Sequence, residues 1–178
     1  DNGLIQSPKD LKKYSKVIFP GVGSFKRSME LLKKRDLDLA IKDFTSVPAN
    51  KFLGICLGMQ LLYDYSEEDS GYKGLGIIKG AVKRLSGSDI FKVPNVGWRK
   101  IITKSPNVLY NHIDSELILY FVHSYACQTT DEKIVTGTLD HNGLFSCSIE
   151  YEQIYAVQFH PEKSQKIGLK ILSNFIQL

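Results

Sequence analysis

Two units, each a strand pattern followed by a turn and a helix pattern, occupy residues 16–65 and most constrain the fold of this chain. The first is the apolar run 16–19, closed by Pro20-Gly21-Val22-Gly23 and followed by a helix that Ser24 can cap. The second is the apolar run 52–55, followed by a helical pattern over 57–65. Strands that alternate with helices form parallel sheets, with the helices packed on the faces. A further helix is predicted over 37–44.

The second half of the chain is richer in strand patterns. Short apolar runs separated by turn signals such as His141-Asn142-Gly143 lie around Val82 and at 101–102, 117–122, 134–139, 144–149 and 154–159. A last helix is predicted over 164–176, with apolar residues along one face at Ile167, Ile171, Leu172 and Phe175. We therefore expect a single α/β domain over residues 1–178, with an antiparallel portion in its C-terminal half.

The start of the chain is unusual for such a domain. The sequence opens with Asp1-Asn2-Gly3 and reaches a buried strand almost at once. A parallel sheet usually begins with its own βα unit. We therefore expect the domain to lack its first βα unit.

Composition narrows the classes of function. Hydrophobic residues make up 43 % and charged residues 24 %, as in ordinary globular proteins, and the net charge is only +4. The basic residues of 9–35 have the spacing of solvated helix faces, and no nucleic-acid motif accompanies them. No apolar run has the length of a membrane span, and no secretory signal opens the chain. We expect no nucleic-acid or membrane partner and, from three sparse cysteines, free thiols in a reducing, cytoplasmic compartment.

The sharpest local signal is the run Gly54-Ile55-Cys56-Leu57-Gly58. A nucleophile with a glycine two residues to either side suits a tight elbow between a strand and a helix. The start of that helix would direct N–H groups and positive partial charge at the sulfur, which favours the thiolate. A buried structural cysteine packed among small residues would give the same sequence pattern.

A thiol nucleophile needs a proton shuttle, and His160 is the best placed of the four histidines. It follows the strand pattern 154–159, and ligands of open α/β sheets bind at the carboxyl ends of the strands. Glu162 stands two residues further on, across a proline, and could hold the imidazole in one tautomer. Cys56, His160 and Glu162 then supply nucleophile, base and orienting carboxylate.

The other three histidines carry weaker signals. His112 and His141 lie in polar turns and are expected to be exposed, while His123 is either a core histidine or part of the site wall. Two of these histidines and two cysteines fall within residues 123–147, which raises the question of a zinc site. No C-x-x-C pair occurs there, and positions 123 and 127 would lie about 13 Å apart along a strand. We therefore expect no metal, and nothing indicates a cofactor.

The turn Pro20-Gly21-Val22-Gly23 offers a third catalytic feature. Acyl transfer develops an oxyanion, and the backbone N–H groups of a glycine-rich turn can stabilise it. The turn lacks the third glycine of a dinucleotide-binding fingerprint and the Lys-Ser/Thr of a P-loop. It is therefore either an oxyanion-binding turn or an ordinary one.

Three motifs occur in order along the chain: Pro20-Gly21-Val22-Gly23-Ser24-Phe25, Gly54-Ile55-Cys56-Leu57-Gly58-Met59-Gln60 and Gln158-Phe159-His160-Pro161-Glu162-Lys163-Ser164. With them the chain resembles the class I, triad-type glutamine amidotransferases. Val96-Gly97-Trp98 after Pro94, and Tyr120-Phe121-Val122-His123-Ser124-Tyr125, make it similar within that family to the glutaminase subunits of imidazole glycerol phosphate synthases. The resemblance runs from about Val17 to the C-terminus.

The resemblance implies a flavodoxin-like, mostly parallel sheet with helices on both faces. It implies that Cys56 attacks the side-chain amide of glutamine, that His160, oriented by Glu162, protonates the departing ammonia, and that water then cleaves the thioester. The oxyanion would lie near the backbone N–H of Leu57 and that of Val22 or Gly23.

The resemblance also implies a substrate and a protein partner. The family positions that hold glutamine correspond to Gln60, Ser124 and Tyr125. Positions at or near the partner correspond to Trp98, Tyr120 and Lys163. The partner would be a (β/α)₈ barrel cyclase subunit, and the heterodimer would pass ammonia to a nucleotide-derived intermediate in histidine biosynthesis.

Two positions depart from the family pattern and leave the partner open. Members commonly have His where Asn95 stands and Asn where Arg99 stands, in the segment next to the partner. One alternative is a paralogue that supplies ammonia for the amidation of a surface-polysaccharide sugar. Others are a stand-alone hydrolase of peptides or γ-glutamyl compounds and a non-catalytic binding subunit. The complete set of nucleophile, base and carboxylate argues against the last.

Overall fold

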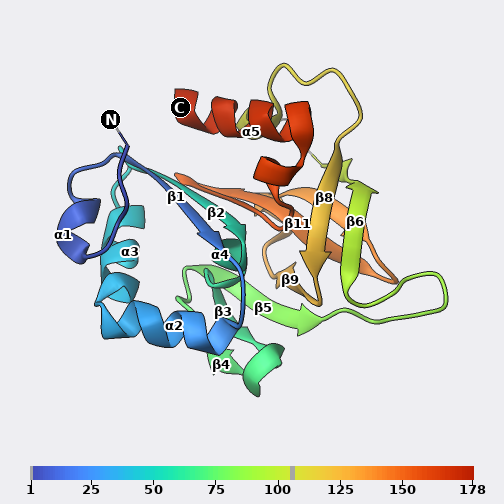
Figure 1. Ribbon diagram of the computed structural model, residues 1–178, viewed down its shortest axis with the longest axis horizontal. Helices are drawn as coiled ribbons and strands as arrows, with labels where there is room; N and C mark the ends of the chain where they lie inside the picture. The colour runs from blue at the N-terminus through green and yellow to red at the C-terminus, as the bar shows by residue number, and fades with distance from the viewer. Residues whose placement is uncertain (1, 105–106) are drawn as a thin grey trace.

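The computed structural model describes residues 2–104 and 107–178 (Figure 1). Its helices are α1 (Pro8–Leu11), α2 (Phe25–Lys34), α3 (Leu37–Thr45), α4 (Leu57–Gln60) and α5 (Gln165–Gln177), with 3₁₀ turns η1 (Glu67–Asp69), η2 (Val108–Tyr110), η3 (Glu132–Ile134) and η4 (Pro161–Lys163). Its strands are β1 (Lys16–Gly21), β2 (Lys51–Cys56), β3 (Tyr63–Ser66), β4 (Tyr72–Lys73), β5 (Ile78–Arg84), β6 (Asn95–Lys100), β7 (Ile102–Thr103), β8 (Ile118–His123), β9 (Tyr125–Thr129), β10 (Val135–Asp140), β11 (Leu144–Tyr151) and β12 (Ile154–Val157).

The main sheet joins a parallel N-terminal part to an antiparallel C-terminal part. Its order is β1-β2-β12-β11-β9-β5-β3-β4, with β10 on β11 and β7 on β10. The pairs β1–β2, β2–β12 and β3–β5 are parallel, and β9, β10, β11 and β12 pair antiparallel with their neighbours in the second half. The last strand of the chain, β12, therefore lies beside the second, β2. This pairing brings residues about a hundred positions apart to the same edge of the sheet.

Helices cover both faces of the sheet, as the alternation of its apolar residues requires. Along β2, Phe52 packs with α2 and α3 in one core, while Leu53 packs with Ile171 and Phe175 of α5 in the other. Figure 1 shows α2 and α3 on one side of β1 and β2 and α5 on the other. The expected α/β fold, with helices on both faces and an antiparallel portion, is confirmed.

The local signals of the first half act as expected, with one exception. Ser24 caps α2 by accepting the backbone N–H of Arg27 at 3.4 Å. The helix predicted over 57–65 is wrong beyond Gln60: α4 has four residues, and Tyr63 already pairs with Ile78 in β3. Helix α4 stops because later N–H groups occupy the carbonyls that it would need.

These competing donors come from the segment before β5. The N–H of Leu75 donates to the carbonyl of Leu61 at 2.8 Å, and those of Ile77 and Ile78 donate to the carbonyl of Leu62 at 2.9 Å. An α-helix would have used the same carbonyls for N–H groups four residues further on. A continuous apolar run is compatible with a helix or a buried strand, and here a contact distant in the sequence decides between them.

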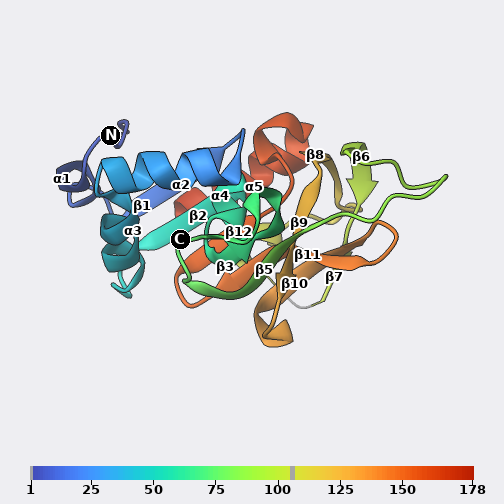
Figure 2. The same ribbon diagram turned by 90° about the horizontal axis from the view of Figure 1, so that it is seen from below.

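Strands β6 and β8 form a separate two-stranded antiparallel sheet among the described residues. The two strands lie side by side at the end of the molecule away from α1, and the view turned by 90° shows the same arrangement (Figures 1 and 2). The expected turn at His141-Asn142-Gly143 joins β10 to β11, with Asp140 opposite Leu144 and positive φ at Asn142 and Gly143. Within residues 2–104 and 107–178, no helix combines the length and the apolar character that a membrane crossing needs.

Helix α5 packs directly on the turn η4, and a glycine makes this possible. A Cβ at Gly168 would overlap with the carbonyl oxygen of Pro161 and lie 2.7 Å from Cβ of Ser164. Since the contact atom is backbone, a larger residue would force α5 away from η4.

We predict that Gly168→Ala lowers the free energy of unfolding by about 1–3 kcal/mol, because the added methyl group displaces a packed helix. Denaturant titration followed by circular dichroism measures this loss. Gly87→Ala is the matched control, since a Cβ there would meet only atoms at 3.6 Å. Equal midpoints for the two variants would contradict the close packing of α5 on η4.

Candidate active site

Cys56 lies at an elbow where β2 ends and α4 begins. Its φ is +53° and its ψ is −109°, a conformation that non-glycine residues rarely adopt and that is common at functional sites. The flanking glycines allow the elbow to pack closely. A Cβ at Gly58 would overlap with the carbonyl oxygen of Phe19, and one at Gly54 would lie 2.9 Å from the carbonyl oxygen of Gly58. The strain is therefore located at the cysteine, and the glycines permit the backbone contacts that hold it.

The thiol of Cys56 is protonated in this structure. Burial raises its pKa to about 11, although the N–H of Leu57 and the side-chain amide of Gln158 both lower it. The N–H contribution has the predicted sign, but burial outweighs it, and one helical turn supplies only a small dipole. The helix start therefore favours the thiolate in direction, as expected, but it does not lower the pKa of Cys56 below its usual value. The cysteine needs a base to remove its proton.

His160 is the candidate for such a base. Its Nδ1 lies 2.7 Å from Oε1 of Glu162, so the carboxylate holds the ring proton at Nδ1. Its Nε2 is buried and has no hydrogen-bond partner among the residues that the structure describes. A buried nitrogen without a partner is costly unless it serves a reaction or a ligand. Nε2 is thus an acceptor available to a thiol or a substrate.

Backbone contacts to β8 fix the turn that carries His160. The N–H of His160 donates to the carbonyl of Tyr120 at 2.9 Å. The hydroxyl of Ser164 donates to the carbonyl of His160 at 2.7 Å and accepts the N–H of Tyr120 at 3.0 Å. These bonds tie β8, η4 and the start of α5 together around the imidazole.

The structure brings the three predicted triad residues to one edge of the sheet. In the parallel pair β2–β12, Val157 lies opposite Ile55, so Cys56 and the segment after Val157 leave the sheet together. The charge of Glu162 raises the pKa of Cys56 and that of Lys163 lowers it, so both groups lie within electrostatic range of the thiol. Sulfur, imidazole and carboxylate thus belong to one cluster.

The glycine-rich turn also reaches this edge. Gly21 is the register partner of Cys56 in the pair β1–β2, and a Cβ there would lie 3.1 Å from Cβ of Leu57. Val22 is 78 % exposed, and Gly23 has a φ of +106°. The predicted oxyanion donors are therefore next to the nucleophile, on a turn whose outer part is open to solvent.

The residues predicted to hold substrate lie on the other side of the elbow. Gln60 is buried, and its Nε2 donates to the carbonyl of Tyr125 at 2.9 Å and to Oε1 of Gln158 at 3.0 Å. Ser124 directly precedes Tyr125, and its carbonyl accepts the N–H of Leu85 at 2.9 Å. Gln60 and Tyr125 are thus in direct contact, and Ser124 lies at the strand junction beside them.

The residues predicted to meet a partner form one surface cluster. Trp98 of β6 lies opposite Tyr120 of β8, with ring centroids 5.8 Å apart. The ammonium of Lys163 lies 5.9 Å from the centroid of the Tyr120 ring, at cation–π distance. Trp98 is 41 % exposed, so this cluster presents an aromatic surface to solvent.

Three side chains of the site region were not predicted from the sequence. Gln158 donates from Nε2 to the sulfur of Cys56 at 3.6 Å, Asn95 contacts His123, and Ser164 holds the turn of His160. Gln158 and Ser164 stood inside the motif that carries His160, and their polarity beside a buried strand was a usable signal. Only tertiary contacts identify Asn95.

Two of the other histidines are buried. His123 bonds with both ring nitrogens, so it is a satisfied core histidine, the first of the two interpretations. The expectation that His141 is exposed is wrong: it is 2 % exposed, its Nε2 lies 3.0 Å from the carbonyl oxygen of Lys92, and Phe91 packs against its ring. A loop distant in the sequence folds over the polar turn, which the local pattern could not reveal. His112 is exposed, as expected.

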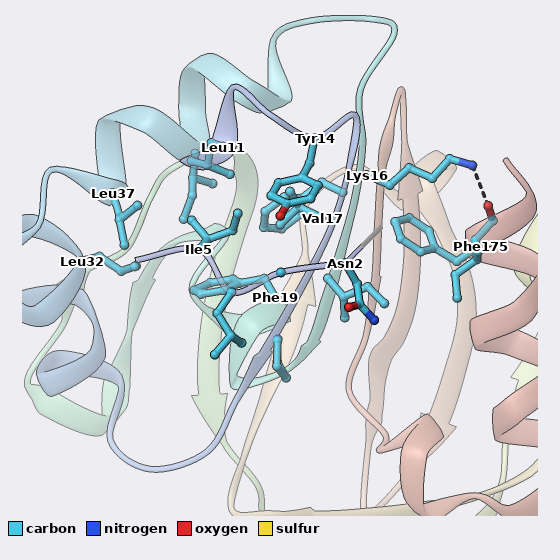
Figure 3. A pocket seen from close by; sticks show the side chains of 17 residues that line it. Asn2, Ile5, Leu11, Tyr14, Lys16, Val17, Phe19, Leu32, Leu37 and Phe175 are labelled. Atoms are coloured by element: carbon cyan, nitrogen blue, oxygen red, sulfur yellow. Dashed lines mark hydrogen bonds between the residues drawn. The ribbon is translucent and has the colours of Figure 1, made fainter. Parts of the chain in front are cut away.

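An apolar hollow of about 860 Å³ lies elsewhere, along β1 and the N-terminal segment (Figure 3). Figure 3 shows Val17, Phe19, Leu32 and Phe175 pointing into it, with Asn2 and Ile5 passing across. Among the residues that the structure describes, its lining contains no cysteine, histidine or carboxylate. It is therefore separate from the nucleophile and carries no acyl-transfer chemistry.

We predict that alkylation of Cys56 by iodoacetamide is slow at neutral pH and accelerates about tenfold per pH unit up to pH 10, because only the thiolate reacts and burial keeps the pKa near 11. Mass spectrometry of the Cys56 peptide after timed exposure measures the rate. The same chain in denaturant is the control, with a thiol that titrates near ~8.5. A pH-independent rate in the folded chain would show that the resting sulfur is already ionised.

Comparisons with known proteins show the family of the chain. The family model for class-I glutamine amidotransferases matches residues 4–178. A protein of Sulfurimonas denitrificans named imidazole glycerol phosphate synthase subunit HisH is 44 % identical over 171 residues, 94 % of this chain and 82 % of that protein. The HisH 1 protein of Campylobacter jejuni is 41 % identical over 177 residues, 99 % of this chain and 88 % of that protein.

Solved structures extend the agreement to the fold. A crystal structure of a glutamine amidotransferase superposes with a TM-score of 0.70 at 14 % identity, covering 96 % of this chain and 84 % of the other. A glutamine amidotransferase from Thermotoga maritima gives a TM-score of 0.63 at 17 % identity, covering 94 % of this chain and 64 % of the other. The chain therefore belongs to the class-I glutamine amidotransferase family of enzymes, and within that family it is related to the HisH subunits of imidazole glycerol phosphate synthase.

Proposed function

We propose that this chain hydrolyses glutamine to glutamate and ammonia through Cys56, His160 and Glu162. The observation that carries the proposal is the state of His160, whose Nδ1 is bonded to Glu162 at 2.7 Å while its buried Nε2 has no partner among the described residues. The imidazole lies at the same sheet edge as a strained cysteine with a protonated thiol. A buried imidazole nitrogen without a partner and a thiol that must lose a proton are complementary.

Acylation begins when Nε2 of His160 takes the proton of the Cys56 thiol. The sulfur forms a bond to the side-chain amide carbon of glutamine, and the carbonyl electron pair moves to oxygen. The backbone N–H of Leu57, with that of Val22 or Gly23, stabilises the resulting oxyanion. His160 then returns the proton to the amide nitrogen as the carbon–nitrogen bond breaks, which releases ammonia and leaves a γ-glutamyl thioester.

Deacylation repeats these steps with water as the nucleophile. His160 takes a proton from water, the hydroxide attacks the thioester carbon, and the carbon–sulfur bond breaks. The proton on the imidazole returns to the sulfur, so glutamate leaves and the thiol is restored. Glu162 keeps the ring in one orientation throughout and stabilises the imidazolium that forms twice in each cycle.

The substrate would lie between the turn at Gly23 and the strand junction at Ser124 and Tyr125. Gln60 supports this, because its buried amide lies on the nucleophile's helix and holds the Tyr125 carbonyl at 2.9 Å. Entry of glutamine would also give Nε2 of His160 a polar neighbour during the reaction.

We propose that the ammonia passes to a (β/α)₈ barrel cyclase subunit in histidine biosynthesis. The names of the relatives, which call them subunits of imidazole glycerol phosphate synthase, support a second subunit. The cluster of Trp98, Tyr120 and Lys163 supports a docking surface here, since Trp and Tyr are enriched at protein interfaces. Lys163 directly follows the carboxylate of the triad, so an interface on this cluster would lie next to the site of ammonia release. Direct transfer preserves the nucleophile, because ammonia in bulk water at neutral pH becomes ammonium.

We predict that Cys56→Ala lowers the rate of glutamine hydrolysis by at least ~10³-fold while the fold stays intact, because no other group in the cluster can form the thioester. Glutamate release measures the rate, and circular dichroism checks the fold. Cys147→Ala is the matched control: this cysteine is also buried, but it lies within β11. Turnover in Cys56→Ala close to that of the parent would remove the nucleophile from the proposal.

We also predict that Trp98→Ala weakens binding of the cyclase by at least ~10-fold, because an exposed aromatic anchor at the centre of an interface carries much of its energy. Titration calorimetry with the purified cyclase measures the affinity. Leu39→Ala is the control, since this residue is 61 % exposed on α3, away from β6. Equal affinity of both variants would show that the partner docks elsewhere. Co-purification of a cyclase homologue from a sugar pathway would instead indicate that the ammonia is used to amidate a sugar.

A further inference from the structure

A chain of hydrogen bonds begins at Arg99, on the β6 strand. Its Nε donates to Oδ1 of Asn95 at 3.0 Å. Nδ2 of Asn95 lies 3.1 Å from Nε2 of His123, and Nδ1 of His123 lies 2.8 Å from the carbonyl oxygen of Tyr125. Because a carbonyl only accepts, the ring proton is on Nδ1, and Nε2 accepts from the amide of Asn95. Asn95 is fully buried and His123 is 6 % exposed.

The chain continues from Tyr125 to the nucleophile. The carbonyl of Tyr125 also accepts from Nε2 of Gln60, and the same amide nitrogen donates to Oε1 of Gln158. Nε2 of Gln158 in turn donates to the sulfur of Cys56 at 3.6 Å. Four buried polar side chains and one carbonyl therefore connect a strand at the molecular surface to the thiol.

The bonds fix orientations in two arms, one from Arg99 and one from Gln60, which meet at the carbonyl of Tyr125. The guanidinium has no acceptor, so it orients Asn95 with Oδ1 toward itself and Nδ2 toward His123. The Asn95 amide then selects the His123 tautomer, and Gln60 directs the oxygen of the Gln158 amide away from the sulfur. An N–H of Gln158 is thereby left facing Cys56. If Gln158 turned over, an oxygen would face the sulfur and disfavour its negative charge.

We propose that Arg99 and Asn95 are positioning residues of the glutaminase reaction, which through His123 hold the Tyr125 carbonyl that anchors Gln60 and Gln158 beside the Cys56 sulfur, and so link the nucleophile to the β6–β8 surface. The inference rests on the proposed function, because the reaction it concerns is glutamine hydrolysis. The hydrogen bonds themselves do not depend on that function. The inference gives a role to Asn95 and Arg99, the two positions at which the chain departs from the family pattern, because their side chains bond to each other. The hydrogen bond from Gln158 favours the thiolate, which agrees with its effect on the pKa of Cys56.

Arg99 also joins the chain to the aromatic cluster. Its Nη1 donates to the carbonyl of Trp98 at 3.0 Å and its Nη2 to that of Val96 at 3.3 Å. A molecule that contacts Trp98 would thus also affect the backbone segment to which the guanidinium of Arg99 is hydrogen-bonded. The β6–β8 surface and the nucleophile are therefore connected by bonds that each have one preferred direction.

The test compares Arg99→Leu with Lys100→Leu in the complete chain. Both variants remove one positive charge from β6, but the ammonium of Lys100 pairs with Glu116 and, among the described residues, forms no hydrogen bond with a member of the chain of bonds. The rate of Cys56 alkylation by iodoacetamide is measured from pH 7 to pH 10, with thermal unfolding as the check on the fold. The charges nearest the thiol, Glu162 and Lys163, are the same in both variants.

We expect Arg99→Leu to alkylate about fivefold or more slowly than the parent at every pH, the effect of one lost hydrogen bond, and Lys100→Leu to match the parent. Arg99→Gln, which keeps an amide donor, is expected to recover part of the rate. In glutamine hydrolysis, Arg99→Leu should lower kcat more than it raises KM. Overlapping alkylation profiles for the parent and both variants would overturn the proposal.

A second measurement needs no variant. Nitrogen NMR of the imidazole groups in the parent chain reports the tautomer of His123, and we expect the proton on Nδ1. A proton on Nε2 would break the direction of the chain and overturn the proposal, even if Arg99→Leu failed to fold. Neither measurement requires turnover. Failure of the proposed function would therefore be seen in a different experiment, in which the Cys56→Ala variant still hydrolyses glutamine.

Discussion

The parallel pairing of β2 with β12 is the constraint on which the rest of the site depends. It places Val157 opposite Ile55, so the cysteine that ends one strand and the histidine that follows the other leave the sheet at the same edge. No local property of either segment could do this, since the two are about a hundred residues apart. Helix α5 stabilises the arrangement by packing on η4 at Gly168, while its apolar face covers β2 at Phe175.

Burial and reactivity oppose each other at Cys56. The elbow hides the sulfur among apolar side chains, which raises its pKa to about 11 and protects the thiol from solvent. The same dry surroundings strengthen every hydrogen bond that later stabilises charge. In the mechanism that we propose, the buried imidazole of His160 resolves the conflict, because the proton moves only when the base and a substrate are both in place. A low-pKa thiolate is then not required in the resting molecule.

Buried polar groups give the site its orientation. Asn95, His123, Gln60 and Gln158 are all at most 6 % exposed, and His123 and Gln60 both donate to the carbonyl of Tyr125, which joins the two halves of the network. Such a network costs desolvation and is stable only when complete, so it favours one arrangement of the strands around the elbow. It also extends to the β6 strand, which carries the exposed ring of Trp98. Surface and nucleophile thus share one set of hydrogen bonds.

Sequence alone determined the features that depend on neighbours along the chain. These are the two strand–turn–helix units, the elbow at Cys56, the cap at Ser24 and the pairing of His160 with Glu162 two residues away. Resemblance to a family added the positions of Gln60, Tyr125 and Trp98, which the structure brings into contact with the site and with Tyr120. Tertiary structure alone decided that the helix at Leu57 stops after four residues, that His141 is buried, that the thiol stays protonated and that Arg99 connects to Gln158. Each of these depends on groups far apart in the sequence, whose hydrogen bonds and burial exist only once the sheet has formed.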